Sequence, residues 1–193
     1  MNNKWTIDKT FNFEMGHRVW AQKLAHAHLS ISTDCACKHL HGHSYEIRVF
    51  LTSDFLDQSS MVTDFKNLNF MKKFVDDVLD HKFMLDINDP NFERITGVNS
   101  GIKNRIKDND ESKFVNFVNL KYALLSAGAN WTPSDWEDQR EYYESFVLVD
   151  FVPTSENICR YLKEYAQHQL GDVATVSALE LWETKKSHCR YEG

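Results

Sequence analysis

Three histidines near the start of the chain have a spacing that could hold a metal ion. His41 and His43 lie two residues apart, so on a strand they share one face with Tyr45. His17 ends an earlier strand-like segment. If the two strands pair antiparallel, three imidazoles meet at one edge of the buried face, with a fourth metal position open for water or substrate, which is typical of catalytic zinc. Gly42, between two of the histidines, would let a ligand approach closely.

A His-x-His pair alone is weak evidence for a metal site, because such pairs also occur by chance. The third histidine, in phase on a separate strand, is what favours metal binding. The other histidines of this region lie in the polar loop between the strands, where solvated side chains are the default, and are not assigned as ligands: His26, His28 and His39.

Two cysteines precede the histidine pair. Cys35 and Cys37 lie six and four residues before His41. A thiol close to a cation loses its proton more readily, so either could act as a general base or nucleophile. The alternatives are a structural zinc ligand or an inert small side chain, but a zinc finger would need a second ligand pair, and the sequence offers none nearby.

Three further residues could take part in chemistry. Asp80 and His81 follow a predicted helix, and a carboxylate can fix the tautomer of an imidazole that relays a proton. Because adjacent residues rarely face the same way, this pair needs a turn. Glu183 is in phase with Leu179 and Leu181 on the last predicted strand, so its carboxylate is expected to point into the apolar face, where a ligand with two N–H groups would satisfy it. Exposure at the strand end is the alternative.

The elements that must position these residues follow from hydrophobic periodicity. Alternating apolar residues predict three strands: residues 5–17, 41–51 and 176–184. Helical spacing predicts two helices, one over residues 65–79 after an N-cap at Asp64 and one that begins after residues 153–156 and ends at Gly171. Alternating rather than continuous apolar strands favour an antiparallel α+β domain over a doubly wound parallel one.

Residues 87–146 do not follow this pattern. They are rich in turn residues and charges, with one apolar helix-like stretch, and we interpret them as a partly helical insertion within a single domain of residues 1–193. Its aromatic side chains could cap a pocket or cover a subunit contact, but the sequence favours a small core of their own: Trp131, Trp136, Tyr142 and Tyr143.

Composition excludes several classes of protein. The chain has 193 residues, of which 42% are hydrophobic and 26% charged, as in an ordinary globular domain. A formal net charge of −6 argues against a duplex nucleic-acid binder. No stretch approaches the roughly 18 apolar residues of a membrane span, and the N-terminus lacks the apolar core of a signal peptide. We therefore expect a cytoplasmic protein with reduced thiols.

Six stretches, in order, resemble the family of 6-pyruvoyltetrahydropterin and 6-carboxytetrahydropterin synthases. They cover residues 5–86 and 147–193: FNFEMGHRV, CACKHLHGHSYEIRV, MVTDFKNL, LDHKFML, PTSEN and LELWETKKSHCRYEG. The resemblance implies that zinc is bound by His17, His41 and His43. It further implies a catalytic thiol in the cysteine before HGH, a catalytic Asp80–His81 pair and a pterin-anchoring carboxylate at Glu183.

The fold implied by this resemblance is the tunnelling fold (T-fold), a four-stranded antiparallel sheet with two helices on one face. Subunits of this family join their sheets into barrels, commonly as trimers stacked into hexamers, with active sites between subunits. The shared substrate is 7,8-dihydroneopterin triphosphate. The insertion at residues 87–146 departs from the compact family pattern and bears on oligomer geometry and substrate access.

Two branches of the family differ in the position of the thiol. The carboxy-forming enzymes of the queuosine (7-deazaguanine) pathway resemble C-x-x-x-H-G-H, which Cys37 satisfies, whereas the pyruvoyl-forming enzymes of biopterin synthesis place the cysteine where this chain has Cys35. The predicted helix, PTSEN and SHCRYEG are more similar to the carboxy-forming branch. The expected product is then 6-carboxy-5,6,7,8-tetrahydropterin, released with acetaldehyde and triphosphate. A pyruvoyl-forming enzyme and a non-catalytic zinc-binding member of the family are the alternatives.

Overall fold

The polypeptide forms two compact units. The computed structural model describes residues 4–22, 35–108, 118–120, 124, 139 and 141–193. The first unit comprises Met1–Glu14, His43–Asp80 and Thr154–Gly193, and the second comprises Met15–Gly42 and His81–Pro153.

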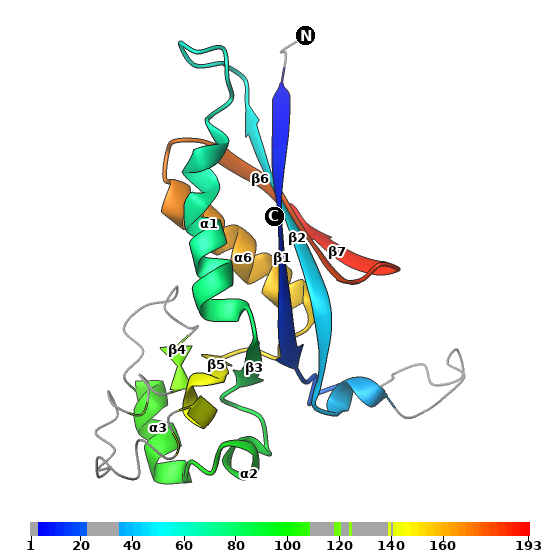
Figure 1. Ribbon diagram of the computed structural model, residues 1–193, viewed down its shortest axis with the longest axis vertical. Helices are drawn as coiled ribbons and strands as arrows, with labels where there is room; N and C mark the ends of the chain where they lie inside the picture. The colour runs from blue at the N-terminus through cyan, green and yellow to red at the C-terminus, as the bar shows by residue number, and fades with distance from the viewer. Residues whose placement is uncertain (1–3, 23–34, 109–117, 121–123, 125–138, 140) are drawn as a thin grey trace. The chain divides into compact units, whose positions relative to one another are not determined.

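The first unit is built on four neighbouring strands, in the order β1-β2-β6-β7 (Figure 1). Their bounds are Trp5–His17 for β1, His41–Ser53 for β2, Thr175–Thr184 for β6 and Ser187–Tyr191 for β7. Strand β2 pairs antiparallel with β6, which pairs antiparallel with β7. Strands β1, β2 and β6 agree with the expected segments, because alternation of apolar residues identified each of them.

One face of this sheet is buried and the other is half-exposed. The odd residues of β2 from Tyr45 to Leu51 are almost completely buried, while Glu46 and Arg48 between them are only partly covered. Helix α6, Ser155–Leu170, packs against β6 and β7 and ends before Gly171, as predicted. The alternation of the strands therefore decides which side chains face the helical layer.

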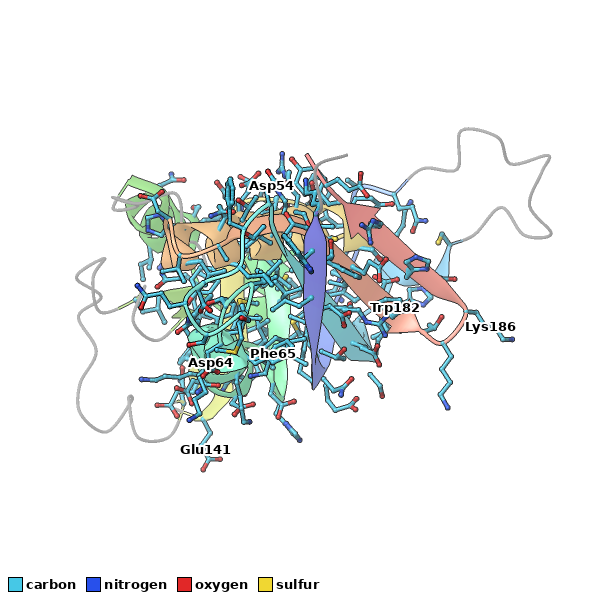
Figure 2. The ribbon with its side chains drawn as sticks, turned by 90° about the horizontal axis from the view of Figure 1, so that it is seen from above. Asp54, Asp64, Phe65, Glu141, Trp182 and Lys186 are labelled. Carbon is cyan, nitrogen blue, oxygen red and sulfur yellow. The ribbon has the colours of Figure 1, made fainter. Side chains whose placement is uncertain are left out.

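The predicted helix over residues 65–79 is confirmed in extent but not as one regular α-helix. It consists of a 3₁₀ segment η3, Phe65–Leu68, helix α1, Asn69–Phe74, and a π-helical segment η4, Val75–Leu79. The predicted N-cap is confirmed, because Asp64 accepts a hydrogen bond from the backbone N–H of Lys66 at 2.8 Å. Figure 2 shows Asp64 and Phe65 side by side at this start.

The second unit contains three short strands beside the end of β1. Strands β3, Lys82–Asp86, β4, Val118–Asn119, and β5, Phe146–Val149, give the order β4-β5-β3-β1. The β1–β3 and β3–β5 pairs are parallel, and the β4–β5 pair is antiparallel. Its described helical segments include η2, Ala36–Lys38, α2, Phe92–Thr96, and α3, Ser100–Asp108, and residues 141–144 are helical as well.

The expected sheet of four antiparallel strands is therefore wrong in its details. The described residues form seven strands in mixed directions, and the three extra ones belong to the second unit. Strand β5 is buried at all four positions, so it shows no alternation that a sequence pattern could detect. The α+β class itself is confirmed.

The second unit has an apolar core of its own. Its cluster of buried residues comes largely from the stretch interpreted as an insertion: Leu85, Ile87, Phe92, Val98, Leu120, Leu124, Tyr143, Phe146 and Leu148. Tyr143 is part of it, and Tyr142 donates a hydrogen bond from its hydroxyl to the carbonyl of Ile95. Trp131 and Trp136 lie outside the described residues. Among the described helices, none has the length and apolar character needed to cross a membrane.

Candidate metal and catalytic centre

Three imidazoles meet where β1 ends and β2 begins. Nitrogen atoms of His17, His41 and His43 all lie within 4.8 Å of one another. The rings of His17 and His41 have centroids 4.5 Å apart and are tilted by 49°. His17 is only 1% exposed, whereas the other two histidines are half-buried. Three imidazole nitrogens at this spacing could hold a metal ion and leave part of its coordination sphere open.

The hydrogen bonds around two of these histidines indicate which nitrogen faces a metal. The Nδ1 atom of His17 lies 2.7 Å from the carbonyl oxygen of Pro153, and Nδ1 of His41 lies 2.9 Å from the carbonyl oxygen of His39. A carbonyl oxygen can only accept, so each Nδ1 carries the proton in these contacts. The Nε2 lone pair is then available, and a backbone carbonyl on the other ring nitrogen is the usual outer partner of a metal-bound histidine. The residues present therefore fit a bound metal.

Gly42 lies where the backbones of β1 and β2 come close together. A Cβ atom at this position would lie 3.0 Å from the carbonyl oxygen of Met15 and 3.4 Å from the Cα of Gly16. The glycine thus allows the backbone of β1 to approach the start of β2.

The two candidate thiols lie in one short turn. Cys35 precedes the 3₁₀ segment η2 and Cys37 is within it. Both are half-buried, and neither forms a disulfide. The carbonyl oxygen of Cys37 accepts a hydrogen bond from the backbone N–H of Val19 at 2.8 Å. This bond attaches the turn to the residues that directly follow His17.

Asp80 and His81 lie at a sharp change of chain direction. The N–H of Asp80 donates to the carbonyl of Val75 at 2.9 Å, which closes the π-helical turn. Its carboxylate accepts a hydrogen bond from the N–H of Glu14 on β1 at 2.8 Å. His81 has a φ of 58°, in the left-handed region that non-glycine residues rarely adopt. The turn that the sequence required for this pair is present, with backbone strain at a candidate catalytic residue.

Glu183 is half-buried near the end of β6 and lies close enough to Tyr45 for its charge to act there. The regular pairing of β2 with β6 reaches Glu46 and Trp182, and the pairing of β6 with β7 is irregular between Trp182 and Thr184. Burial, and then the negative charge of Glu183, raise the pKa of the Tyr45 hydroxyl. Glu183 is thus neither fully exposed nor fully buried, and its predicted role as a pterin anchor stays a prediction.

Tyr45 also contacts the metal-site candidate, which the sequence did not reveal. Its ring is 1% exposed and meets the ring of His43 edge-on, with centroids 5.7 Å apart. In the sequence it is one more apolar residue of an alternating strand. Trp182, which pairs with Glu46 on β2, stacks on His188 in the β6–β7 hairpin, whose turn contains Lys186 (Figure 2).

Comparison with known proteins identifies the family. The family model described as 6-pyruvoyl tetrahydropterin synthase matches residues 6–193. The chain belongs to this family. A curated relative from Aquifex aeolicus, named 6-carboxy-5,6,7,8-tetrahydropterin synthase, is 30% identical and covers 98% of both chains. A relative of the same name from Haemophilus influenzae is 25% identical over 96% of this chain and 97% of its own. Both names belong to the branch that the sequence favours.

Solved structures with a similar fold include two with high coverage of this chain. An uncharacterized protein from Wolinella succinogenes is 36% identical, with a TM-score of 0.76 and 98% of each chain covered. The 6-pyruvoyl tetrahydropterin synthase of Caenorhabditis elegans is 21% identical, with a TM-score of 0.55, 99% of this chain and 96% of its own covered. The second likeness concerns the fold alone.

Proposed function

We propose that this protein is a 6-carboxytetrahydropterin synthase of queuosine (7-deazaguanine) biosynthesis. It converts 7,8-dihydroneopterin triphosphate into 6-carboxy-5,6,7,8-tetrahydropterin, with release of acetaldehyde and triphosphate. The observation that carries the proposal is the cluster of His17, His41 and His43. This chain matches two curated relatives of that name over nearly their full length.

The metal in this proposal is zinc, held by Nε2 of His17 and of His41 and by a nitrogen of His43. The carbonyls of Pro153 and His39 keep the first two rings in the tautomer that such binding needs. A bound zinc ion supplies a Lewis acid that polarises the side-chain oxygens of the substrate. The chain's own residues then bind the pterin and move the protons.

Cys37 is the proposed general base. As a thiolate it removes a proton from the side chain of the substrate, because a thiol beside a cationic site is more acidic than a free one. Cys37 is half-buried rather than fully enclosed. Asp80 and His81 relay protons while triphosphate leaves, with Asp80 held against β1 by the N–H of Glu14.

Glu183 is the proposed anchor for the pterin ring. A carboxylate accepts two parallel N–H bonds from the amino-pyrimidine edge, which fixes both the position and the orientation of the ring. Tyr45 contacts His43 and is also influenced by the charge of Glu183. In this proposal Glu183 binds the pterin ring and the side chain of the substrate reaches the three histidines.

The proposal includes assembly and location. The four strands of the first unit with α1 and α6 are the part of the chain that corresponds to the tunnelling fold. We propose a cytoplasmic homo-oligomer built on trimers, with active sites shared between subunits, by analogy with the family.

A second candidate function is the pyruvoyl-forming reaction. It is favoured by Cys35, which is half-buried in the same turn as Cys37 and has the spacing of that branch. A non-catalytic zinc-binding role is the third possibility, but such a protein would not need the thiol, the Asp80–His81 pair and Glu183 together.

Product identification tests the proposal. The purified protein is incubated with 7,8-dihydroneopterin triphosphate, and the products are identified by mass spectrometry. The proposal predicts 6-carboxytetrahydropterin together with acetaldehyde. A pyruvoyl product would assign the protein to the other branch and point to Cys35, and absence of turnover in zinc-loaded protein would favour the binding role.

A further inference from the structure

Two buried carboxylates in the second unit have no part in the proposed reaction. Asp86, at the end of β3, is 2% exposed, and Asp89, three residues later, is completely buried. Carboxylates are seldom buried at this level unless they have strong partners. Both find their partners in the short segment of residues 18–20, which begins directly after His17.

Asp89 forms an ion pair with Arg18. The Nε atom of Arg18 lies 3.2 Å from Oδ2 of Asp89, and the two side chains are 13% and 0% exposed. The other oxygen, Oδ1, accepts a hydrogen bond from the N–H of Asn91 at 2.7 Å. A buried pair of this kind is strongly sensitive to loss of one partner, because the remaining charge would have no compensation.

Asp86 binds the same segment two residues further on. Its Oδ2 accepts a hydrogen bond from the indole N–H of Trp20 at 2.7 Å. Its Oδ1 accepts from the backbone N–H of Asn88 at 2.8 Å, which orients the carboxylate. The segment is therefore fastened at Arg18 and at Trp20 by two carboxylates of one turn.

Between Arg18 and Trp20 lies Val19, which binds the Cys35–Cys37 turn. The N–H of Val19 donates to the carbonyl of Cys37 at 2.8 Å. A displacement of residues 18–20 would lengthen this bond and move the turn that carries Cys35 and Cys37. The same segment continues directly from His17, whose ring is held by Pro153.

We propose that Asp86 and Asp89 are positioning residues that fix the Cys35–Cys37 turn through Arg18, Val19 and Trp20. The inference rests on the proposed function only for its effect on turnover, since the placement of the turn is a property of the folded chain. Neither carboxylate touches substrate. The turn between β3 and α2 thus contributes to the active site indirectly, by holding residues 18–20 in place.

The first test needs no substrate. Hydrogen exchange of the peptide containing Val19, and the rate of alkylation of Cys37 by iodoacetamide, are measured by mass spectrometry in the full-length, zinc-loaded protein. Asp89→Asn breaks the ion pair, and Trp20→Phe removes the indole N–H together with part of the ring. Each is expected to accelerate exchange at Val19 by about tenfold, through local opening, and to change the alkylation rate of Cys37. Glu93→Gln, an exposed carboxylate on α2, is the matched control and is expected to change neither.

The second test measures turnover of 7,8-dihydroneopterin triphosphate. Because a displaced base lowers the rate of the chemical step more than substrate affinity, Asp89→Asn should lower kcat about tenfold and leave KM within about twofold. If the wild-type protein does not turn over this substrate, the proposed function fails, while the exchange and alkylation results still decide the positioning role.

Unchanged exchange at Val19 in folded Asp89→Asn and Trp20→Phe proteins would overturn the inference. So would faster exchange spread equally over β3, α2 and β5, because the carboxylates would then stabilise the whole unit rather than the turn. If Asp89→Asn does not fold, Trp20→Phe decides alone, since it loses the hydrogen bond to Asp86 but retains an aromatic side chain.

Discussion

The imidazole of His17, at the end of β1, is held by the backbone carbonyl of Pro153, just before α6. Its Nδ1 atom lies 2.7 Å from the carbonyl oxygen. Because the carbonyl only accepts, the proton of this ring is on Nδ1 and Nε2 has the lone pair. His41 has the same arrangement with the carbonyl of His39. Two of the three candidate ligands are therefore oriented by backbone groups, which do not depend on the identity of neighbouring side chains.

Removal of one ligand tests the metal site. His41→Ala should raise the Kd for zinc by at least about 100-fold, because loss of even an outer partner of a ligand typically costs 10- to 100-fold. Metal content by mass spectrometry of the purified variant measures this. His39→Ala is the control, since it removes an exposed imidazole but keeps the carbonyl that contacts His41. Undiminished stoichiometric zinc in His41→Ala would contradict the three-histidine site.

The anchoring role of Glu183 can be tested by an isosteric substitution. Glu183→Gln keeps the size of the side chain but can no longer accept two N–H bonds, so KM for the pterin substrate should rise by about 10- to 100-fold. The pKa of Tyr45 should fall, because the charge of Glu183 helps to raise it. Glu180→Gln, which alters a carboxylate bound to Arg190, should leave KM unchanged. Equal effects of the two variants on KM would argue against the anchoring role.

The left-handed backbone at His81 has a measurable cost. At a φ of 58°, glycine should be more stable than alanine by about 1 kcal/mol, because only glycine avoids the Cβ clash. Urea unfolding of His81→Gly and His81→Ala compares the two directly, and both should lose turnover if His81 relays protons. An alanine variant as stable as the glycine variant would show that the turn carries no strain.

The buried thiol of Cys159 predicts a loss of stability in alkali. Burial, and then the neighbouring Cys189, raise the pKa of Cys159 from 9.0 to about 12. An unfolded chain therefore releases this proton more readily than the folded one, so the contribution to stability is complete below about pH 9 and declines as pH rises toward 12.

The free energy of unfolding should accordingly fall more between about pH 8 and pH 10 in wild-type protein than in Cys159→Ala, as urea titrations would measure. The comparison of the two proteins removes the effects of tyrosines, which also titrate in alkali. Identical pH dependence in the two proteins would contradict the raised pKa. Iodoacetamide should also label Cys37 well before Cys159 at about pH 8.

Much of the candidate site could be predicted because strand alternation fixes the face on which a side chain lies. His17, His41 and His43 belong to long strands with one buried face, so their parity indicated their neighbours. Tyr45 has the same parity, but an aromatic residue in such a strand cannot be distinguished from core by pattern alone.

Contacts between distant segments could not be predicted. Asp86 and Asp89 lie in a polar turn that looks solvated in the sequence, and nothing local indicates that their partners are Arg18 and Trp20. Strand β5 lacks alternation because it is buried throughout, and Asp80 was placed by a π-helical turn that ordinary helical spacing does not reveal.

The most direct test of the account removes the metal and restores it. The protein is stripped with a chelator, and turnover of 7,8-dihydroneopterin triphosphate is followed as zinc is added back. The account predicts no turnover in metal-free protein, full recovery at one zinc ion per chain, and no recovery in His41→Ala. Undiminished formation of 6-carboxytetrahydropterin by the metal-free protein would contradict it.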